Sequence, residues 1–196
     1  MSIDLHITGD AEADRLLSTD PLALLIGMLL DQQVPMETAF AGPAKLRQRL
    51  GHLDAGRIAA HDPAAFVEIC TTPPAVHRFP GSMAARVQSM CAAVADEWGG
   101  DAAAIWTRGE PDGAEVLKRL EALPVFGSQK ARIFLALLGK RYEVHPSGWR
   151  EAADPYGEAG SYRSVADIVD PASLTKVREF KKAAKAVAKS KEDQSK

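Results

Sequence analysis

The most restrictive feature of the sequence is the stretch Leu22–Leu30, which is apolar on every side when it is wound as a helix. Asp20 and Pro21 come directly before it, and an aspartate cap followed by a proline is typical of a helix start. A helix without a polar face has to be buried on all sides, so the rest of the chain must pack around it. The stretch is shorter than the roughly 18 residues of a membrane span, so we expect a core helix and no membrane partner.

The composition is that of an ordinary globular chain, with 196 residues of which 46% are hydrophobic and 26% are charged. This length is enough for one domain or two small lobes. Cys70 and Cys91 are too few for a four-cysteine zinc or iron–sulfur site, so we expect free thiols, no metal and no cofactor. The first residues contain no basic segment that leads into an apolar one, so we expect no export signal and a cytoplasmic location.

Apolar residues recur at helical spacing along most of the chain, which predicts an all-α fold. Two short stretches alternate instead between apolar and polar residues, at Ile3–Ile7 and at Arg141–His145. This period of two is typical of strands. The N-terminus and residues 141–145 are therefore candidates for a small β ribbon.

The segment 113–139 has the pattern of two helices joined by a tight turn. We expect helices over 114–122 and 128–138, with Gly139 at the end of the second. In the turn, Leu123, Val125 and Phe126 can anchor the chain in the core. Gly127 permits unusual backbone angles and lets the backbone approach a ligand closely.

A helix that begins at Ser128 would offer unpaired N–H groups and the positive end of its dipole, which suits a phosphate. Lys130 and Arg132 add positive charge close to this helix start. The alternative is an ordinary connection between two helices, with no ligand.

Three motifs carry a resemblance to a known family. Leu-Pro-x-x-Gly-x-x-x-Ala over residues 123–131 resembles the hairpin of the helix-hairpin-helix (HhH-GPD, endonuclease III-like) DNA glycosylase superfamily. The stretch 24–33 resembles that family's early helix with its Ser-Gln-Gln-like turn, and 83–87 resembles a helix that precedes the hairpin. The three occur in the family's order over about residues 20–150. The resemblance implies two helical lobes within residues 1–165, followed by a C-terminal helix and basic tail over 166–196.

The resemblance also implies a partner, a DNA duplex that lies across a cleft while a damaged base is turned out of the stack. We expect a monomer that is associated with the nucleoid. Gln32 and Gln33 would fill the gap left in the duplex, although they could also be an ordinary polar helix end. The residues implied to contact DNA are Leu123, Val125, Gly127, Ser128, Gln129, Lys130, Arg132, Gln32 and Gln33.

The sequence departs from the family at both usual catalytic positions. Members that cleave the DNA strand use a lysine two residues after the hairpin glycine, where this chain has Gln129. An amide cannot form a Schiff base, so we expect no lyase activity by that route. Lys130 comes one residue later, about 100° around the helix, and is expected either to contact a phosphate or to be solvated.

The family's catalytic aspartate is also absent, because the matching stretch 144–149 holds no carboxylate. The candidates to replace it are Asp154, Asp31 and His145, each of which could instead be a solvated acid or a structural histidine. Three functions stay open: a monofunctional DNA glycosylase that hydrolyses the N-glycosidic bond, a non-catalytic DNA-binding protein of that fold, or a helical domain without a nucleic-acid role.

The net charge of −2 is unusual for a DNA-binding protein, but the charge is distributed unevenly. Residues 176–196 hold eight lysines and arginines and three acids. Phosphate contact depends on local rather than total charge, so this tail could follow a DNA backbone. The alternative is a solvated end without a partner.

Overall fold

The computed structural model describes residues 5–194, with side chains as far as Val187, and the regular elements in this range are helices without any strand. The chain is therefore all-α, as predicted. In chain order the helices are α1 (Ala11–Thr19), α2 (Pro21–Leu30), α3 (Met36–Leu50), α4 (Ala55–Ala59), α5 (Pro63–Thr71), α6 (Pro80–Trp98), α7 (Ala104–Thr107), α8 (Gly113–Glu121), α9 (Ser128–Arg141), α10 (Trp149–Ala152), the 3₁₀ turn η1 (Val165–Asp167) and α11 (Pro171–Gln194).

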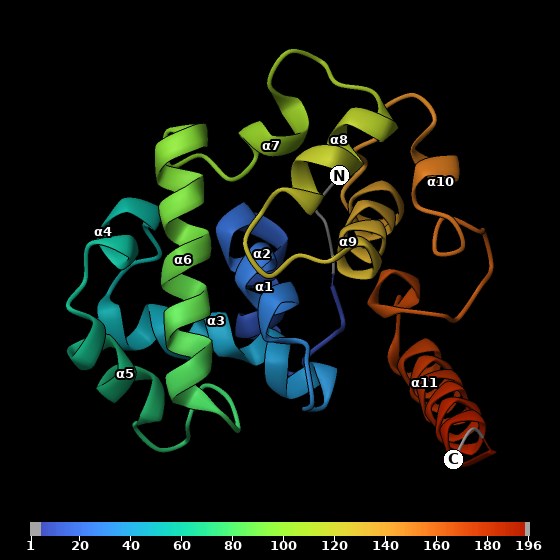
Figure 1. The fold of residues 1–196 in the computed structure, drawn as a ribbon, viewed down its shortest axis with the longest axis horizontal. Helices are drawn as coiled ribbons and strands as arrows, with labels where there is room; N and C mark the ends of the chain where they lie inside the picture. The colour runs from blue at the N-terminus through green and yellow to red at the C-terminus, as the bar shows by residue number, and fades with distance from the viewer. Residues whose placement is uncertain (1–4, 195–196) are drawn as a thin grey trace.

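The helices pack in two groups around one continuous hydrophobic core (Figure 1). In the first group α3 contacts α1, α2 and α5, and α6 contacts α2, α4 and α5. In the second group α8 contacts α7, α9 and α10, while η1 lies between α9 and α11. The boundary expected between residues 165 and 166 falls inside η1 and stays a prediction. None of the helices within residues 5–194 is long and apolar enough to cross a membrane.

Helix α2 is the core element that the sequence predicted. Each residue from Leu22 to Leu30 is buried, and the Asp20 carboxylate caps the helix by accepting the N–H groups of Leu22 and Ala23. A side chain at Gly27 would lie 2.7 Å from the Phe40 ring, so this glycine lets α2 and α3 approach closely. The absence of a polar face on α2 is thus explained by packing on all sides.

The β ribbon is wrong for the residues that the structure describes. Residues 1–4 lie outside that range, and the chain from Leu5 to Thr8 is irregular although Leu5 and Ile7 are buried. The amides of Ile7 and Thr8 donate to the Asp14 carboxylate, at 3.1 and 2.9 Å, rather than to a second strand. Residues 142–145 are likewise irregular. Because a nearby side chain satisfies the backbone, no strand partner is needed.

Helix α9 continues to Arg141, past the glycine that was expected to end it. Gly139 lies inside the helix, and a Cβ at this position would be 2.5 Å from the Trp149 ring, so packing against Trp149 explains the glycine. Gly113, at the start of α8, is restricted in the same way, since its Cβ would lie 2.5 Å from the Trp149 Cα atom. Trp149 therefore fits between α8 and α9 only because both helices have a glycine against it.

We expect the substitution Gly113→Ala to destabilise the protein by about 2–3 kcal/mol, because the new methyl group would collide with backbone that has no free rotamer to adopt. The control is Gly81→Ala in the first turn of α6, where a Cβ would meet no atom within 4 Å. That change should be neutral or stabilising by up to about 1 kcal/mol. Urea unfolding of both variants measures the difference, and a Gly113→Ala variant as stable as the parent would refute the packing argument.

Candidate nucleic-acid interface

The turn between α8 and α9 is anchored in the core at two residues and exposed at its tip. Leu123 and Phe126 are buried, and the Phe126 ring meets Phe134 edge-on with centroids 5.8 Å apart. Val125 was expected to be a third anchor, but its side chain is 38% exposed. The turn thus links two helices and presents its tip to solvent.

The first turn of α9 has free backbone donors at the surface. Gly127, Ser128 and Gln129 are exposed, and no side chain caps the helix. Among the described residues, the N–H groups of residues 128–130 form no hydrogen bond. These amides and the positive end of the helix dipole form a site for an anion. Five other helices have first-turn amides bound by aspartates, at Asp10, Asp20, Asp54, Asp62 and Asp112, whereas α3, α6, α7 and α10 also begin without a side-chain cap.

Gly127 contributes open space rather than an unusual backbone angle. Its φ of −73° is accessible to any residue, which corrects the expectation from the sequence. A Cβ at this position would have no neighbour within 4 Å, so the region in front of the helix start is empty. The left-handed residue of the turn is Val125, with φ of +70°, where a β-branched side chain is strained.

The Lys130 side chain crosses from α9 to the end of α2. Its Nζ atom donates to the carbonyl oxygens of Met28 at 2.8 Å and of Leu29 at 2.7 Å. Burial lowers the pKa of Lys130 to about 8, although the Asp31 carboxylate acts in the opposite direction. The two roles expected for Lys130, a phosphate contact or a solvated side chain, do not fit these contacts. The amine instead neutralises the negative end of the α2 dipole.

The two glutamines after α2 have different environments. Gln32 is held at both ends of its amide, since Nε2 donates to the Leu29 carbonyl and Oε1 accepts from Arg86, each at 2.7 Å. The His77 Nε2 atom lies 2.9 Å from the Gln32 carbonyl oxygen. Gln33 is exposed and has a φ of +59°. Of the pair, Gln33 is the side chain that is free to project from the surface.

The Leu29 carbonyl joins the hairpin to these glutamines. It accepts one hydrogen bond from Lys130 of α9 and one from Gln32, both at 2.7 Å. The start of α9 and residues 31–35, which we call the Gln turn, therefore lie next to each other. Figure 1 shows the turn before α9 crossing in front of α2.

Asp31 is the predicted carboxylate that lies at this junction. It follows the last residue of α2, its side chain is 12% exposed, and its Oδ2 atom is 3.2 Å from Lys181 Nζ of α11. Its charge also acts on Lys130, whose pKa it raises. A partly desolvated carboxylate can stabilise a positive charge that develops nearby, and the two ammonium groups beside Asp31 offset part of its charge.

The other two acid–base candidates lie along α9 rather than at the end of α2. Asp154 is exposed, and its backbone oxygen, rather than its carboxylate, accepts from Arg132 at 3.4 Å. The His145 ring lies 2.8 Å from the Gly139 carbonyl and stacks on Trp149. Gly139 is separated from the start of α9 by about three helical turns, or roughly 16 Å. His145 is thus at the opposite end of α9 from the Gln turn.

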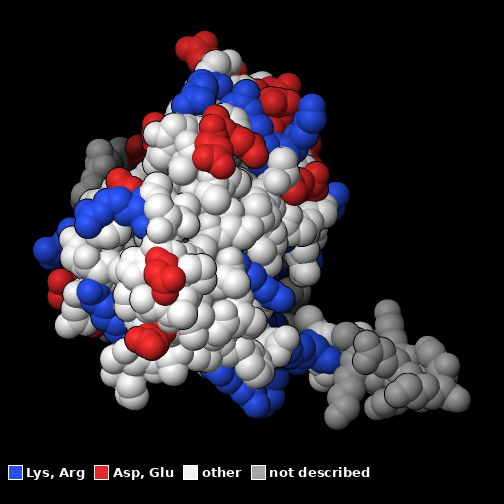
Figure 2. All heavy atoms as spheres, turned by 60° about the vertical axis from the view of Figure 1, so that its left-hand side comes forward, with Lys and Arg blue, Asp and Glu red and all other residues white. Residues whose placement is uncertain are grey.

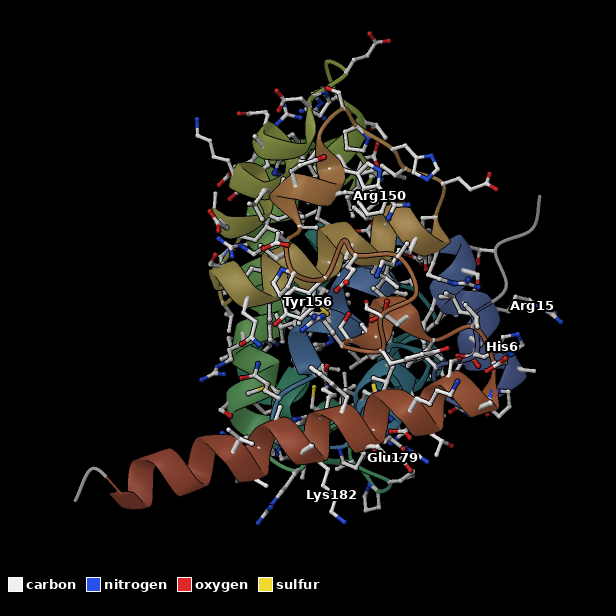
Figure 3. All side chains as sticks on the ribbon, turned by 90° about the vertical axis from the view of Figure 1, so that its right-hand side faces the viewer. His6, Arg15, Arg150, Tyr156, Glu179 and Lys182 are labelled. Carbon is white, nitrogen blue, oxygen red and sulfur yellow. The ribbon has the colours of Figure 1, made fainter. Side chains whose placement is uncertain are left out.

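Gln129, at the position where the sequence resemblance implied a lysine, has an amide that is already hydrogen bonded. Its Nε2 atom donates to the hydroxyl of Tyr156 at 2.9 Å. Tyr156 comes from the loop after α10, which lies over α9 in Figure 3. The pair forms a polar edge beside the first turn of α9.

Two residues of the site have no local sequence signal. His77 contacts a residue 45 positions away, and Lys181 contacts one 150 positions away. The sequence assigned no role to His77 and treated Lys181 only as part of a basic tail. Because such contacts depend on how distant helices pack, a motif could not have found them.

A hollow of about 260 Å³ lies beside the Gln turn and in front of α6. Its rim includes the Phe79 ring, which is 42% exposed, and its lining is Gln32, Gln33, His77, Phe79, Ser82, Met83 and Arg86. A larger hollow of about 750 Å³ between α1 and α3 includes none of these residues. The smaller hollow is therefore the one that belongs to the junction.

The molecular face with α4, α5 and α6 carries no dominant charge. Figure 2 shows a largely uncharged centre with acidic and basic side chains mixed above it, and basic side chains along its lower edge. A phosphate backbone would find little attraction over most of this face.

Residues 26–192 match the profile of the family described as HhH-GPD superfamily base excision DNA repair protein. No curated protein and no solved structure matches the chain. The match includes the hairpin, the Gln turn and most of α11.

We expect the charges around Lys130 to move its pKa in opposite directions. Asp31→Asn should lower the pKa of Lys130 further below about 8, because the carboxylate raises it, whereas Lys181→Gln should raise it, because a like charge is lost. Titration of the Lys130 Cε resonance by NMR measures both shifts. Shifts of the Lys130 pKa with the same sign in Asp31→Asn and Lys181→Gln would contradict the assignment of the neighbouring charges.

In the parent protein, the folded state releases the Lys130 proton below the ordinary pKa of 10.5, so the Lys130 contribution to stability should rise from pH 8 to pH 10.5.

Proposed function

The chain belongs to the HhH-GPD superfamily of base excision DNA repair proteins, a DNA-binding family, and we propose that it is a monofunctional DNA glycosylase. In this proposal it hydrolyses the N-glycosidic bond of a damaged base in duplex DNA. It acts as a monomer on nucleoid DNA in the cytoplasm.

The observation that carries the proposal is the junction at the Leu29 carbonyl. A phosphate at the free amides of α9 would be adjacent to the Gln turn, because Lys130 and Gln32 share that one acceptor. A protein that turns a nucleotide out must hold the backbone and fill the vacated space at neighbouring points. The hairpin and the Gln turn supply one group of each kind.

In the proposed complex, the free amides of residues 128–130 bind a phosphate in front of Gly127, and Gln33 enters the duplex. Gln33 is suited to this because its side chain is exposed. The Gln32 amide is instead held by hydrogen bonds to Arg86 and Leu29 and stabilises the Gln turn. An amide both donates and accepts hydrogen bonds, so Gln33 can pair with the edge of an unpaired base.

Asp31 is the carboxylate that we propose for the chemical step. As the base leaves, positive charge develops on the sugar, and a fixed negative charge nearby lowers the energy of that state. Asp31 directly follows α2 at the junction and is largely buried, whereas Asp154 is exposed beside Arg132 of α9, and His145 contacts Gly139 near the end of that helix. Its ion pair with Lys181 holds the carboxylate in one orientation before DNA arrives.

Strand cleavage through a Schiff base is not part of the proposal. Gln129 has no amine, and the Lys130 amine is occupied by two carbonyl groups of α2. A nucleophilic lysine needs a free, unprotonated amine that faces the sugar. The product would therefore be an abasic site in an intact strand.

One observation favours the alternative of a non-catalytic protein that binds damaged DNA. The Asp31 carboxylate is already paired with Lys181, which offsets part of its charge. A carboxylate neutralised in this way stabilises a cationic sugar less strongly. The chemical assay below separates the two functions.

We expect the protein to release a base from at least one duplex in a panel with single lesions: uracil, 8-oxoguanine, alkylated bases and mismatches. Treatment with hot alkali converts each abasic site into a strand break that a gel resolves. Breaks that depend on alkali support the glycosylase. Breaks without alkali would show lyase activity and contradict a monofunctional enzyme. Binding without breaks identifies the non-catalytic alternative.

Gly127→Asp should weaken DNA binding by about tenfold or more, because it puts an anion where the phosphate binds. Gly127→Ala is the matched control, since its methyl group enters open space and adds no charge. Equal affinity of the two variants, with unchanged circular dichroism, would remove the hairpin from the interface.

Asp31→Asn should reduce base release by about 100-fold with little loss of DNA affinity, because a developing charge loses its counter-ion. Asp154→Asn and His145→Ala should retain the parent rate. Lys181→Gln breaks the same ion pair but keeps the carboxylate, so it tests whether structural loosening alone explains the effect. The assignment fails if Lys181→Gln loses as much activity as Asp31→Asn.

A further inference from the structure

We propose that the C-terminal half of α11, residues 181–194, is a second DNA-binding arm that holds the sugar–phosphate backbone beside the lesion. This inference rests on the proposed DNA-binding function, and adds a contact that the hairpin and the Gln turn do not provide. Four features of α11 support it: its fixed attachment, its direction, its charge and its lack of an apolar face.

The attachment of α11 to the body is firm in its first half. Ser173 and Val177 are buried, and the helix packs against η1. Two ion pairs then fasten the helix to the region of the Gln turn, Lys181 with Asp31 and Arg178 with Glu37. These contacts set the direction in which the rest of the helix runs.

That direction leads past the Gln turn, on the side of the molecule that presents the hairpin turn. The turn before α9 faces the viewer in Figure 1. In Figure 3, rotated by 90°, this side is on the left, and α11 runs to the left beyond the packed helices. A duplex bound at the hairpin and at Gln33 would therefore lie beside the projecting helix.

The arm has the charge that a phosphate backbone requires. Residues 181–191 contain five lysines and no acid, and four of them, at positions 182, 185, 189 and 191, follow the Lys181 that pairs with Asp31. Lys182 and Lys185 are exposed and three positions apart, so they lie on one side of the helix. Fourteen helical residues span about 20 Å, which corresponds to about six base pairs of duplex.

The arm also lacks the features of a protein-binding helix. Its exposed residues between the lysines are Ala183, Ala184 and Ala186, and Val187 is its one larger apolar side chain as far as side chains are described. Phe180, one residue before the arm, is also exposed, and its ring lies 5.8 Å from the Arg163 guanidinium of the body. A helix that docks on a protein usually carries an apolar stripe. Small residues between lysines suit a polyanion, because they let the ammonium groups come close to its surface.

The test compares Lys182→Gln/Lys185→Gln with the control Arg15→Gln/Arg47→Gln, which removes the same charge. Arg15 and Arg47 line the hollow between α1 and α3, and Arg15 is at the right of Figure 3, opposite the arm. The probes are an undamaged duplex and the same duplex with a central abasic-site analogue, and affinity is measured over a range of salt concentrations.

We expect the arm variant to lose about 3–10-fold in affinity for both duplexes and to reduce the slope of log K against log salt by about 2, near 0.9 for each phosphate contact. The control should keep the parent slope, and Lys182→Arg/Lys185→Arg should restore it. The arm variant should also keep the parent's ratio of affinities for the two duplexes, because phosphate contacts carry no sequence information.

An unchanged salt slope in the arm variant, or an equal loss of affinity in the control, would overturn the proposal that the arm binds DNA. If Gly127→Asp still abolishes binding in that case, the proposed function stands without it. If the parent protein binds neither duplex at low salt, the arm and the proposed function both fail.

Discussion

The buried ammonium group of Lys130 determines how the hairpin and the Gln turn are placed relative to each other. It belongs to the second group of helices but bonds to the last carbonyls of α2 in the first group. Removing a charge from water is costly, which is the reason that its pKa falls to about 8. The dipole of α2 and the Asp31 carboxylate offset part of this cost. The result is a polar contact between α2 and α9, two helices whose buried side chains belong to one hydrophobic core.

Features that depend on neighbours in the chain could be predicted from the sequence. The burial of α2 followed from its lack of a polar face, and the link between α8 and α9 followed from helical periodicity on both sides of a short turn. Features that depend on distant residues could not. The amides of Ile7 and Thr8 donate to the Asp14 carboxylate rather than to a second strand, and Gly139 lies inside α9, where it packs against Trp149. At the site, the sequence located the hairpin and Gln turn but not the partners of Lys130 or Asp31.

The hairpin turn departs from two local rules of protein structure. Helix α8 starts with an aspartate cap, whereas α9 starts with no side-chain cap, and Val125 adopts a backbone angle that suits glycine. Each departure costs stability, and such costs persist mainly where the surrounding structure and a function require them. The tip of the turn combines both departures with high exposure. The Gln turn has the same departures, because Gln33 is exposed with a φ of +59° and α3 begins without a side-chain cap.

The single core that runs through both groups of helices has a mechanical consequence for any nucleic acid that binds between them. Two bodies with separate cores could swing apart and close around a ligand, but bodies that share buried side chains move together. The adjustment then falls to the nucleic acid, for which a bend of 40–90° over a short site costs about 1–6 kcal/mol. A stiff receptor of this kind discriminates by how easily each duplex deforms. Sites that are already weakened in stacking or pairing are then the ones that fit at the lowest cost.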